Sequence, residues 1–333
     1  MELKLGKLPP DVLEKYLLGM TGAKSRDLVV SPSLGVDFGV VRHGNAQLIV
    51  SSDPVTGVKE RVGWYAVNVS ANDIATSGNR PQFLQSIILL PERASVRDVA
   101  RISSEMDRTA SSLGITIVGG HTELTPGLRR PIVITTAFAF ASSYVTAADA
   151  KEGDAILITK TAGIEGTAIC ASDSPALEGR VDPDVITRAK RYFRKLSVVD
   201  EAAAAYATGA VHAMHDCTEG GVLGAVYEMS RASKLGFELQ ESSIPIATET
   251  AAVCSALKLD PLRLISSGTL LVSVEAGRER EVIRAIVKAG SRATVIGRFR
   301  KGRRSLVHRD GSVEHIVDAP TDELWKLVGK QGM

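Results

Sequence analysis

The residues best suited to chemistry in this sequence are carboxylates at the ends of strand-like segments or inside a helix-like one. Asp37 lies between two glycines, Asp53 precedes Pro54 at the end of a strand-like run, and Asp73 follows Asn72 within a helix-like run. Aspartate and asparagine are poor helix formers, so this pair lowers the stability of a helix. We therefore interpret it as a pair present for function. Such carboxylates suit Mg²⁺, which prefers oxygen and commonly bridges to phosphates. The alternatives are a turn residue for Asp37 and a solvent-facing position for the Asn72–Asp73 pair.

Two glycine pairs could supply phosphate ligands. The stretch Ile115–Glu123 has four strand-favouring residues, then Gly119-Gly120, then His121, Thr122 and Glu123. Residues 216–221 repeat this order, because Asp216 follows a strand-like run and Gly220-Gly221 opens a helix-like one. Glycines permit close approach of a ligand, and helix N-termini attract anions. The alternative for the first stretch is a tight turn with a solvated tip.

Alternating strands and helices would position these residues. The length of 333 residues suggests two domains. An Ala-rich, charged segment at residues 146–153 is the expected boundary, which gives domains of residues 1–145 and 150–333. The principal elements expected in the first region are strands at Gln47–Ser51, Phe83–Leu90, Ile115–Val118 and Ile132–Phe140, and helices at Gly63–Ser77 and Ser95–Ser112.

The composition excludes several classes of function. Apolar content of 44% and a net charge of +2 are typical of a folded protein without a nucleic-acid-binding patch or a polybasic membrane anchor. No uncharged apolar run approaches the ~18 residues of a membrane helix. The three scattered cysteines, Cys170, Cys217 and Cys254, fit a reducing compartment. We therefore expect a cytoplasmic protein that binds neither nucleic acid nor a membrane.

Several common catalytic motifs are missing. The sequence has no Gly-Lys-Ser/Thr, no Gly-x-Gly and no Gly-x-Ser-x-Gly, so neither a P-loop, a dinucleotide fingerprint nor a nucleophile elbow is predicted. A zinc cluster of His212, His215 and Cys217 is not expected, because residues three apart on a strand face opposite sides.

The order of these motifs resembles that of the aminoimidazole ribonucleotide (AIR) synthetase superfamily. This PurM-like superfamily includes PurM, selenophosphate synthetase, thiamine-monophosphate kinase and the hydrogenase-maturation protein HypE. The resemblance covers nearly the whole chain and is closest to HypE and HypE-like proteins. It rests on five segments in order: Gly35-x-Asp37, Ser52-Asp53-Pro54, Asn72-Asp73-Ile74-Ala75, Gly119-Gly120-His121-Thr122 and Asp216-x-Thr218-x-Gly220-Gly221.

The resemblance implies a two-domain α/β (α+β) fold. The N-terminal α/β domain would bind ATP and Mg²⁺ and build a barrel across a homodimer, and the C-terminal α+β domain would close the site. The implied metal ligands are Asp37, Asp53, Asp73 and Glu123. The implied nucleotide-binding residues are Asn72, Gly119, Gly120, Thr122, Thr218, Gly220 and Gly221, and the implied catalytic residues are Asp73, His121 and Asp216.

Three departures from HypE affect the expected chemistry. HypE ends in Pro-Arg-Ile-Cys, and that cysteine carries the carbamoyl group, whereas this sequence ends in Lys330-Gln331-Gly332-Met333. His121 stands where relatives often have an acidic residue; it would contact phosphate, or Glu123 would take the metal, since neutral imidazole is a poor Mg²⁺ ligand. Residues 266–269, Ser-Ser-Gly-Thr, replace the Asn-Glu-Gly-Lys of HypE.

Three functions remain open on this basis. The first is a HypE-like, ATP- and Mg²⁺-dependent enzyme that acts on a small-molecule or protein-borne acceptor without the tail-cysteine dehydration. The second is a small-molecule kinase resembling thiamine-monophosphate kinase. The third is a non-enzymatic nucleotide-binding protein that partners the maturation proteins of hydrogenase.

Overall fold

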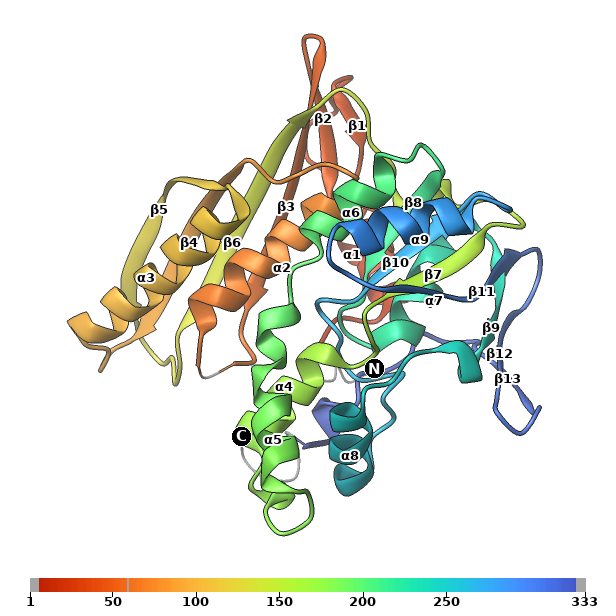
Figure 1. Ribbon diagram of the computed structural model, residues 1–333. Coiled ribbons are helices and arrows are strands. Elements are labelled where there is room, and N and C mark those ends of the chain that lie inside the picture. The colour runs from red at the N-terminus through yellow and green to blue at the C-terminus, as the bar shows by residue number, and fades with distance from the viewer. Residues whose placement is uncertain (1–5, 59, 328–333) are drawn as a thin grey trace.

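A computed structural model describes residues 6–58 and 60–327 of the chain, and it has two β-sheets with helices packed around them (Figure 1). The first sheet has six strands in the order β1-β2-β3-β6-β4-β5. The second has seven in the order β13-β12-β9-β11-β7-β10-β8. This is a mixed α/β fold, as the sequence predicts. The expected domain limits, 1–145 and 150–333, and the dimeric barrel remain predictions.

The first sheet is antiparallel except where β4 pairs with β5, which are parallel and joined through α3. The predicted cap of α3 is present, because Ser95 and Asp98 form a reciprocal capping box. The elements are α1 (Pro10–Tyr16), β1 (Leu28–Val30), β2 (Gly39–His43), β3 (Ala46–Val55), α2 (Val62–Thr76), β4 (Phe83–Pro91), α3 (Val96–Leu113), β5 (Thr116–Thr125) and β6 (Ile132–Ala141).

The second sheet is antiparallel except where β9 pairs with β12. Its elements are β7 (Ala155–Thr159), α4 (Ile164–Asp173), α5 (Pro183–Lys190), α6 (Val199–Tyr206), β8 (Val211–Asp216), α7 (Gly221–Ser233), β9 (Gly236–Gln240), α8 (Thr248–Leu257), β10 (Leu270–Val274), α9 (Glu279–Lys288), β11 (Ala293–Arg300), β12 (Arg304–Val307) and β13 (Val313–His315). Short 3₁₀ turns occur at Ala147–Asp149, Pro175–Leu177, Arg191–Lys195 and Glu241–Ser243.

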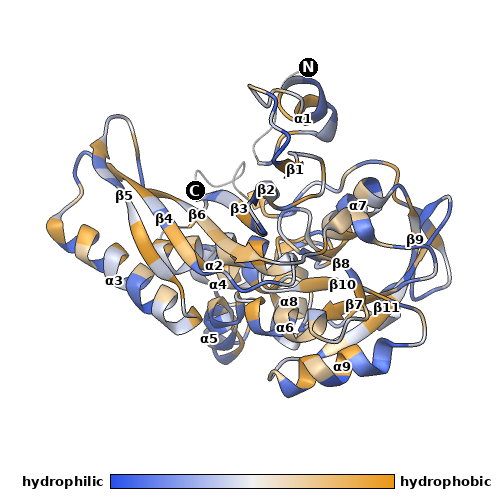
Figure 2. Cartoon of the chain, turned by 90° about the horizontal axis from the view of Figure 1, so that it is seen from above, coloured by the Kyte–Doolittle hydropathy of each residue, from blue (hydrophilic) through white to orange (hydrophobic). Residues whose placement is uncertain are grey.

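Hydrophobic residues gather along the strands, whereas the outer helices α3 and α9 mix hydrophilic and hydrophobic residues (Figure 2). Within the described part of the chain, no helix combines the length and apolar character that crossing a membrane requires.

Helix α2 joins the two sheets. It packs against β3 and β6 on one side and against β8 and α6 on the other. The Asn72 side chain donates from Nδ2 to the Leu196 carbonyl (2.8 Å) and accepts from the Val198 N–H at Oδ1 (2.9 Å). Both polar atoms of this buried amide therefore form hydrogen bonds with the second half of the chain, and the neighbouring Asp73 lies where the two halves meet.

Two predicted strand ends are wrong. Strand β3 continues through Asp53 and Pro54, with Pro54 opposite Ile134 of β6. The proline is tolerated because β2 pairs with β3 only as far as Val50, and beyond that point no described strand pairs with this edge of β3.

Strand β5 likewise continues through the glycine pair, so Gly119–Thr122 is not a loop. The pair lies in the parallel ladder with β4, where Gly120 is opposite Ser86. A Cβ atom on Gly120 would lie 2.0 Å from the Ser86 carbonyl oxygen. Glycine is therefore needed here because the neighbouring strand approaches closely, and not because the chain turns as the sequence suggested.

Candidate active site

Four aspartates from four separate segments meet at the junction of the two sheets. Asp37 precedes β2, Asp53 lies in β3, Asp73 in α2, and Asp216 ends β8. Asp53 and Asp73 lie close enough to perturb each other's pKa, and Asp37 and Asp216 lie within electrostatic reach of both. The structure thus brings together four of the residues that the sequence singles out.

The carboxylates of the cluster raise one another's pKa. Burial raises the pKa of Asp73 well above its ordinary value, and Asp53, Asp216 and Asp37 add to this effect. The Ser51 hydroxyl opposes it by donating to Asp73 Oδ2 at 2.6 Å. Burial also raises the pKa of Asp216, with a further contribution from Asp37. Crowded buried carboxylates of this kind are suited to hold a cation.

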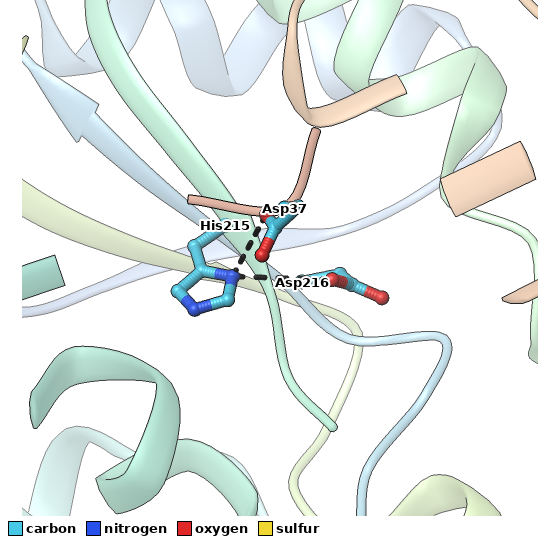
Figure 3. A group of neighbouring side chains, drawn as sticks. All are labelled: Asp37, His215 and Asp216. Carbon is cyan, nitrogen blue, oxygen red and sulfur yellow. Dashed lines mark ion pairs between the residues drawn. The ribbon is translucent and has the colours of Figure 1, made fainter. Parts of the chain in front are cut away.

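A chain of charged side chains that the sequence did not predict adjoins this cluster. His215 is 2% exposed, and its Nδ1 lies 3.0 Å from Asp37 Oδ2 and 3.9 Å from Asp216 Oδ1 (Figure 3). Its Nε2 lies 3.0 Å from Glu228 Oε2. The Lys7 ammonium donates to the other oxygen of Glu228 at 2.7 Å.

The charges along this chain support one another. Burial disfavours a charged His215, but Asp37 and Glu228 outweigh it and raise the pKa of His215 to about 10. Burial also disfavours a charged Glu228, but His215 and Lys7 lower the pKa of Glu228 to about 2. The predicted opposite facing of the two histidines is confirmed: His212 contacts Asp154 through Nδ1 at 2.9 Å and does not join the cluster.

The second glycine pair opens α7, as the sequence predicts. Gly220 and Gly221 have φ of +78° and +61°, where a side chain is strained. The Gly220 N–H donates to Asp322 Oδ2 at 2.7 Å, and the Gly221 N–H donates to the Thr218 carbonyl at 3.1 Å. These two N–H groups already have protein partners, so they are not free to bind phosphate in this conformation.

The remaining predicted residues lie elsewhere. The Asn72 amide bonds to the backbone of Leu196 and Val198, so its side chain is not placed as expected for a residue that faces the nucleotide. Gly119, Gly120 and Thr122 lie in β5, which forms one edge of the first sheet, away from β8 (Figure 1). On the same exposed strand His121 Nε2 lies 3.1 Å from Glu123 Oε2. Among the described residues, no hydrogen bond or ion pair links this pair to the four aspartates.

A cavity of about 520 Å³ lies beside the cluster. Its lining includes Lys7, Glu219, Tyr227, Glu228 and Trp325. Glu219 is also within electrostatic reach of Asp53, so the cavity adjoins the carboxylates. Its volume is in the range of small-molecule sites.

The fold and the family comparison define the class of protein. Residues 35–141 match the family described as AIR synthase related protein, N-terminal domain, and residues 151–309 match its C-terminal domain. The chain therefore belongs to the AIR synthase related family, which confirms the resemblance in its sequence and the PurM-like fold that it implies.

Within this family the chain is HypE-like. It is 29% identical to carbamoyl dehydratase HypE of Escherichia coli K12, over 76% of this chain and 75% of that protein. It is 28% identical to a Methanocaldococcus jannaschii protein that carries a hydrogenase expression/formation name, over 78% and 76% of the two chains.

Solved structures show the same fold. A chain from the HypE–HypF complex has a TM-score of 0.76 at 21% identity and covers 92% of this chain and 99% of its own. AaThiL complexed with AMPPCP and TMP has a TM-score of 0.69 at 19% identity, over 84% and 88%. A HypE structure in complex with ATP has the same TM-score at 19% identity, over 95% and 96%.

Proposed function

We propose that this chain is an ATP- and Mg²⁺-dependent enzyme whose metal and phosphate site is the cluster of Asp37, Asp53, Asp73 and Asp216. The observation that carries this proposal is the convergence of these carboxylates from both halves of the chain. Both carboxylate oxygens of Asp216 are buried and have no hydrogen-bond partner in the part of the chain that the structure describes. Such atoms are costly unless another group satisfies them, so the donor set fits an oxygen-preferring cation.

Different residues of the chain would hold the metal, orient a ligand and close the site. Asp37, Asp53 and Asp73 would hold Mg²⁺, which when bound clamps phosphates and offsets their charge. Ser51 would keep Asp73 oriented through its 2.6 Å hydrogen bond. Asp216, at the end of β8, would close the site from the second half. Glu123 is not part of this ligand set, because it lies on the far edge strand.

The reaction that we favour is a HypE-like, ATP-driven activation of an amide or carbonyl oxygen on a small-molecule or protein-borne acceptor. Its support is the family membership and the HypE names of the relatives. The cavity beside Glu219 would admit the acceptor next to the phosphates. The residues compared with the HypE tail, 330–333, lie outside the described part of the chain.

A second candidate is phosphate transfer to a small molecule. Its support is the cavity volume of about 520 Å³ and the fold shared with AaThiL, whose structure holds AMPPCP and TMP. Labelled ATP incubated with a metabolite extract separates the candidates: a labelled metabolite supports the kinase, and ADP without one supports acceptor activation. If neither product forms while ATP still binds, the third function, a nucleotide-binding maturation partner, takes their place.

We further propose a homodimer and a maturation-protein partner. Among the described residues, strand β5 pairs only with β4, and it exposes Ile117, Val118 and Leu124. A second copy would cover this edge and place His121, Thr122 and Glu123 at the interface.

The HypE–HypF complex is the precedent for the maturation partner. The three free, buried cysteines fit the cytoplasmic location that we propose.

Calorimetric titration with AMPPNP and Mg²⁺ tests the nucleotide site. We expect wild-type protein to bind only with Mg²⁺ present, and Asp53→Asn and Asp73→Asn each to weaken binding at least ~10-fold because a charged ligand is lost. Asp200→Asn is the matched control, since Asp200 is an exposed residue that pairs with Arg80. Unaltered affinity in both cluster variants would remove the basis of the proposal.

A further inference from the structure

One wall of the cavity beside the cluster is an N-terminal segment, residues 6–14, which we call the strap. Residues 7–11 and Leu13 of the strap line the cavity, and further lining comes from α7 and Trp325. A Cβ atom on Gly6 would overlap the Trp325 indole, so the strap lies directly against this side chain. Because the strap forms one side of the cavity, its displacement would open the cavity to solvent.

The strap is weakly attached to the rest of the chain. Helix α1 begins within the strap, has no buried residue, and lies outside the body formed by the two sheets (Figure 2). Among the described residues, no backbone hydrogen bond joins residues 6–20 to any other segment. Terminal segments with few buried apolar contacts and no backbone pairing open at a low cost in free energy.

Two ion pairs fasten the strap to α7. The Lys7 ammonium lies 2.7 Å from Glu228 Oε1, and Arg231 Nη2 lies 3.0 Å from Glu14 Oε1. Glu228 and Arg231 are three residues apart, so both ion pairs form on one face of this helix. The Lys7 and Glu14 side chains are 43% and 48% exposed. Ion pairs this exposed are individually weak and are screened by salt, which suits contacts that form and break.

The strap closes next to the aspartate cluster. Glu228 Oε2, the oxygen that Lys7 does not contact, lies 3.0 Å from His215 Nε2, and His215 Nδ1 lies 3.0 Å from Asp37 Oδ2. The carboxylate that anchors the strap thus also contacts the charged chain that leads to the proposed phosphate site. An acceptor activated beside the phosphates would be open to attack by water, and a closed strap would exclude that water.

We propose that the strap is a lid on the acceptor cavity: it opens to admit the acceptor and closes over it through the Lys7–Glu228 and Glu14–Arg231 ion pairs. This role rests on the proposed function, which assigns the acceptor to the cavity. A strap that is only a fixed part of the fold would bury α1 or pair its backbone with a neighbouring strand, and the described residues show neither contact.

Acrylamide quenching of Trp325 fluorescence measures the access of a small molecule to the cavity. The chain has two tryptophans, so a Trp64→Phe background leaves Trp325 as the only one. We expect Lys7→Met to raise the Stern–Volmer constant at least ~1.5-fold, and Lys7→Met with Glu14→Gln to raise it further, because an exposed ion pair shifts an opening equilibrium by only ~2–5-fold. Lys7→Arg should keep the value of the background. Lys24→Met, which changes another exposed lysine near the N-terminus, is the matched control and should also keep it.

A measurement on the unmutated chain guards against a folding defect in the variants. Acetic anhydride should acetylate Lys7 at least ~3-fold more slowly than Lys24 at low salt, and NaCl at about 1 M should reduce this difference by screening the ion pair. Mass spectrometry resolves the two sites. Equal quenching in the background and the double variant, or a ratio of acetylation rates that salt does not change, would overturn the lid. Neither measurement uses nucleotide, so the lid and the nucleotide site fail separately.

Discussion

The carboxyl group of Glu165 gives a quantitative test of the electrostatics next to the site. Glu165 lies in the first turn of α4 and is 6% exposed, and its Oε2 has no hydrogen-bond partner within residues 6–58 and 60–327. Burial raises the pKa of Glu165 from 4.5 to about 7; hydrogen bonds from Ser267 oppose the rise, and Glu219 and Asp322 add to it. Among the described residues no cation forms an ion pair with Glu165.

This raised pKa sets the direction and size of a stability change. Because the folded protein holds the proton more tightly than the unfolded chain, the free energy of unfolding falls as pH rises from 4.5 to about 7. The difference corresponds to about 3 kcal/mol above pH 7. Glu165→Gln removes the ionisation, so the variant should be more stable than wild type by up to about 3 kcal/mol at pH 8 and by less than about 1 kcal/mol at pH 5.

Urea unfolding at pH 5 and pH 8 measures both differences. Glu201→Gln is the control, because Glu201 is equally buried but accepts from Lys160 Nζ and from the Thr159 hydroxyl, each at 2.7 Å. This control should lose about 3 kcal/mol or more at both pH values, since Lys160 is left without its carboxylate. A Glu165→Gln variant that is no more stable than wild type at pH 8, or that gains as much at pH 5, would contradict the raised pKa of Glu165.

Three further substitutions test the contacts that hold the framework. Asn72→Ala should lower the free energy of unfolding by about 2–4 kcal/mol in urea unfolding, because the backbone groups of residues 196 and 198 lose their hydrogen-bond partner. A loss below about 1 kcal/mol would contradict a stabilising role for these two hydrogen bonds. Gly120→Ala should lower the melting temperature more than Gly119→Ala, because a Cβ atom on Gly120 meets the Ser86 carbonyl oxygen, whereas one on Gly119 meets no described atom within 4 Å; equal losses would contradict this steric reason. Val118→Lys should convert a dimer to a monomer in light scattering after size exclusion, and an unchanged mass would exclude the β5 edge as the interface.

The sequence singles out the carboxylates because each lies at the expected end of an element or inside a helix that disfavours it. Asp73 sits beside Asn72 inside a helix, and Asp216 precedes a glycine pair at a helix start. Such features are local, so they are visible without a structure. The alternation of strands and helices and the cap at Ser95 are also local signals, and the structure has both.

What the sequence did not predict depends on distant partners. Strand β5 runs through its glycines because of Ser86 on β4, and β3 runs through Pro54 because β2 stops pairing at Val50. The link between Lys7 and Glu228 joins residues 221 positions apart. His215 gave a weak signal, a histidine beside a candidate aspartate, but only the fold shows that its ring faces Asp37.

The central claim is that one magnesium–nucleotide site lies among the four aspartates. The most direct test is a crystal structure grown with AMPPNP and Mn²⁺ as a visible substitute for Mg²⁺. We predict anomalous density for Mn²⁺ in contact with Asp53 or Asp73, with the triphosphate directed at it and the acceptor cavity beside Glu219 open to the terminal phosphate. Nucleotide bound elsewhere, with no metal density at these carboxylates, would contradict the account.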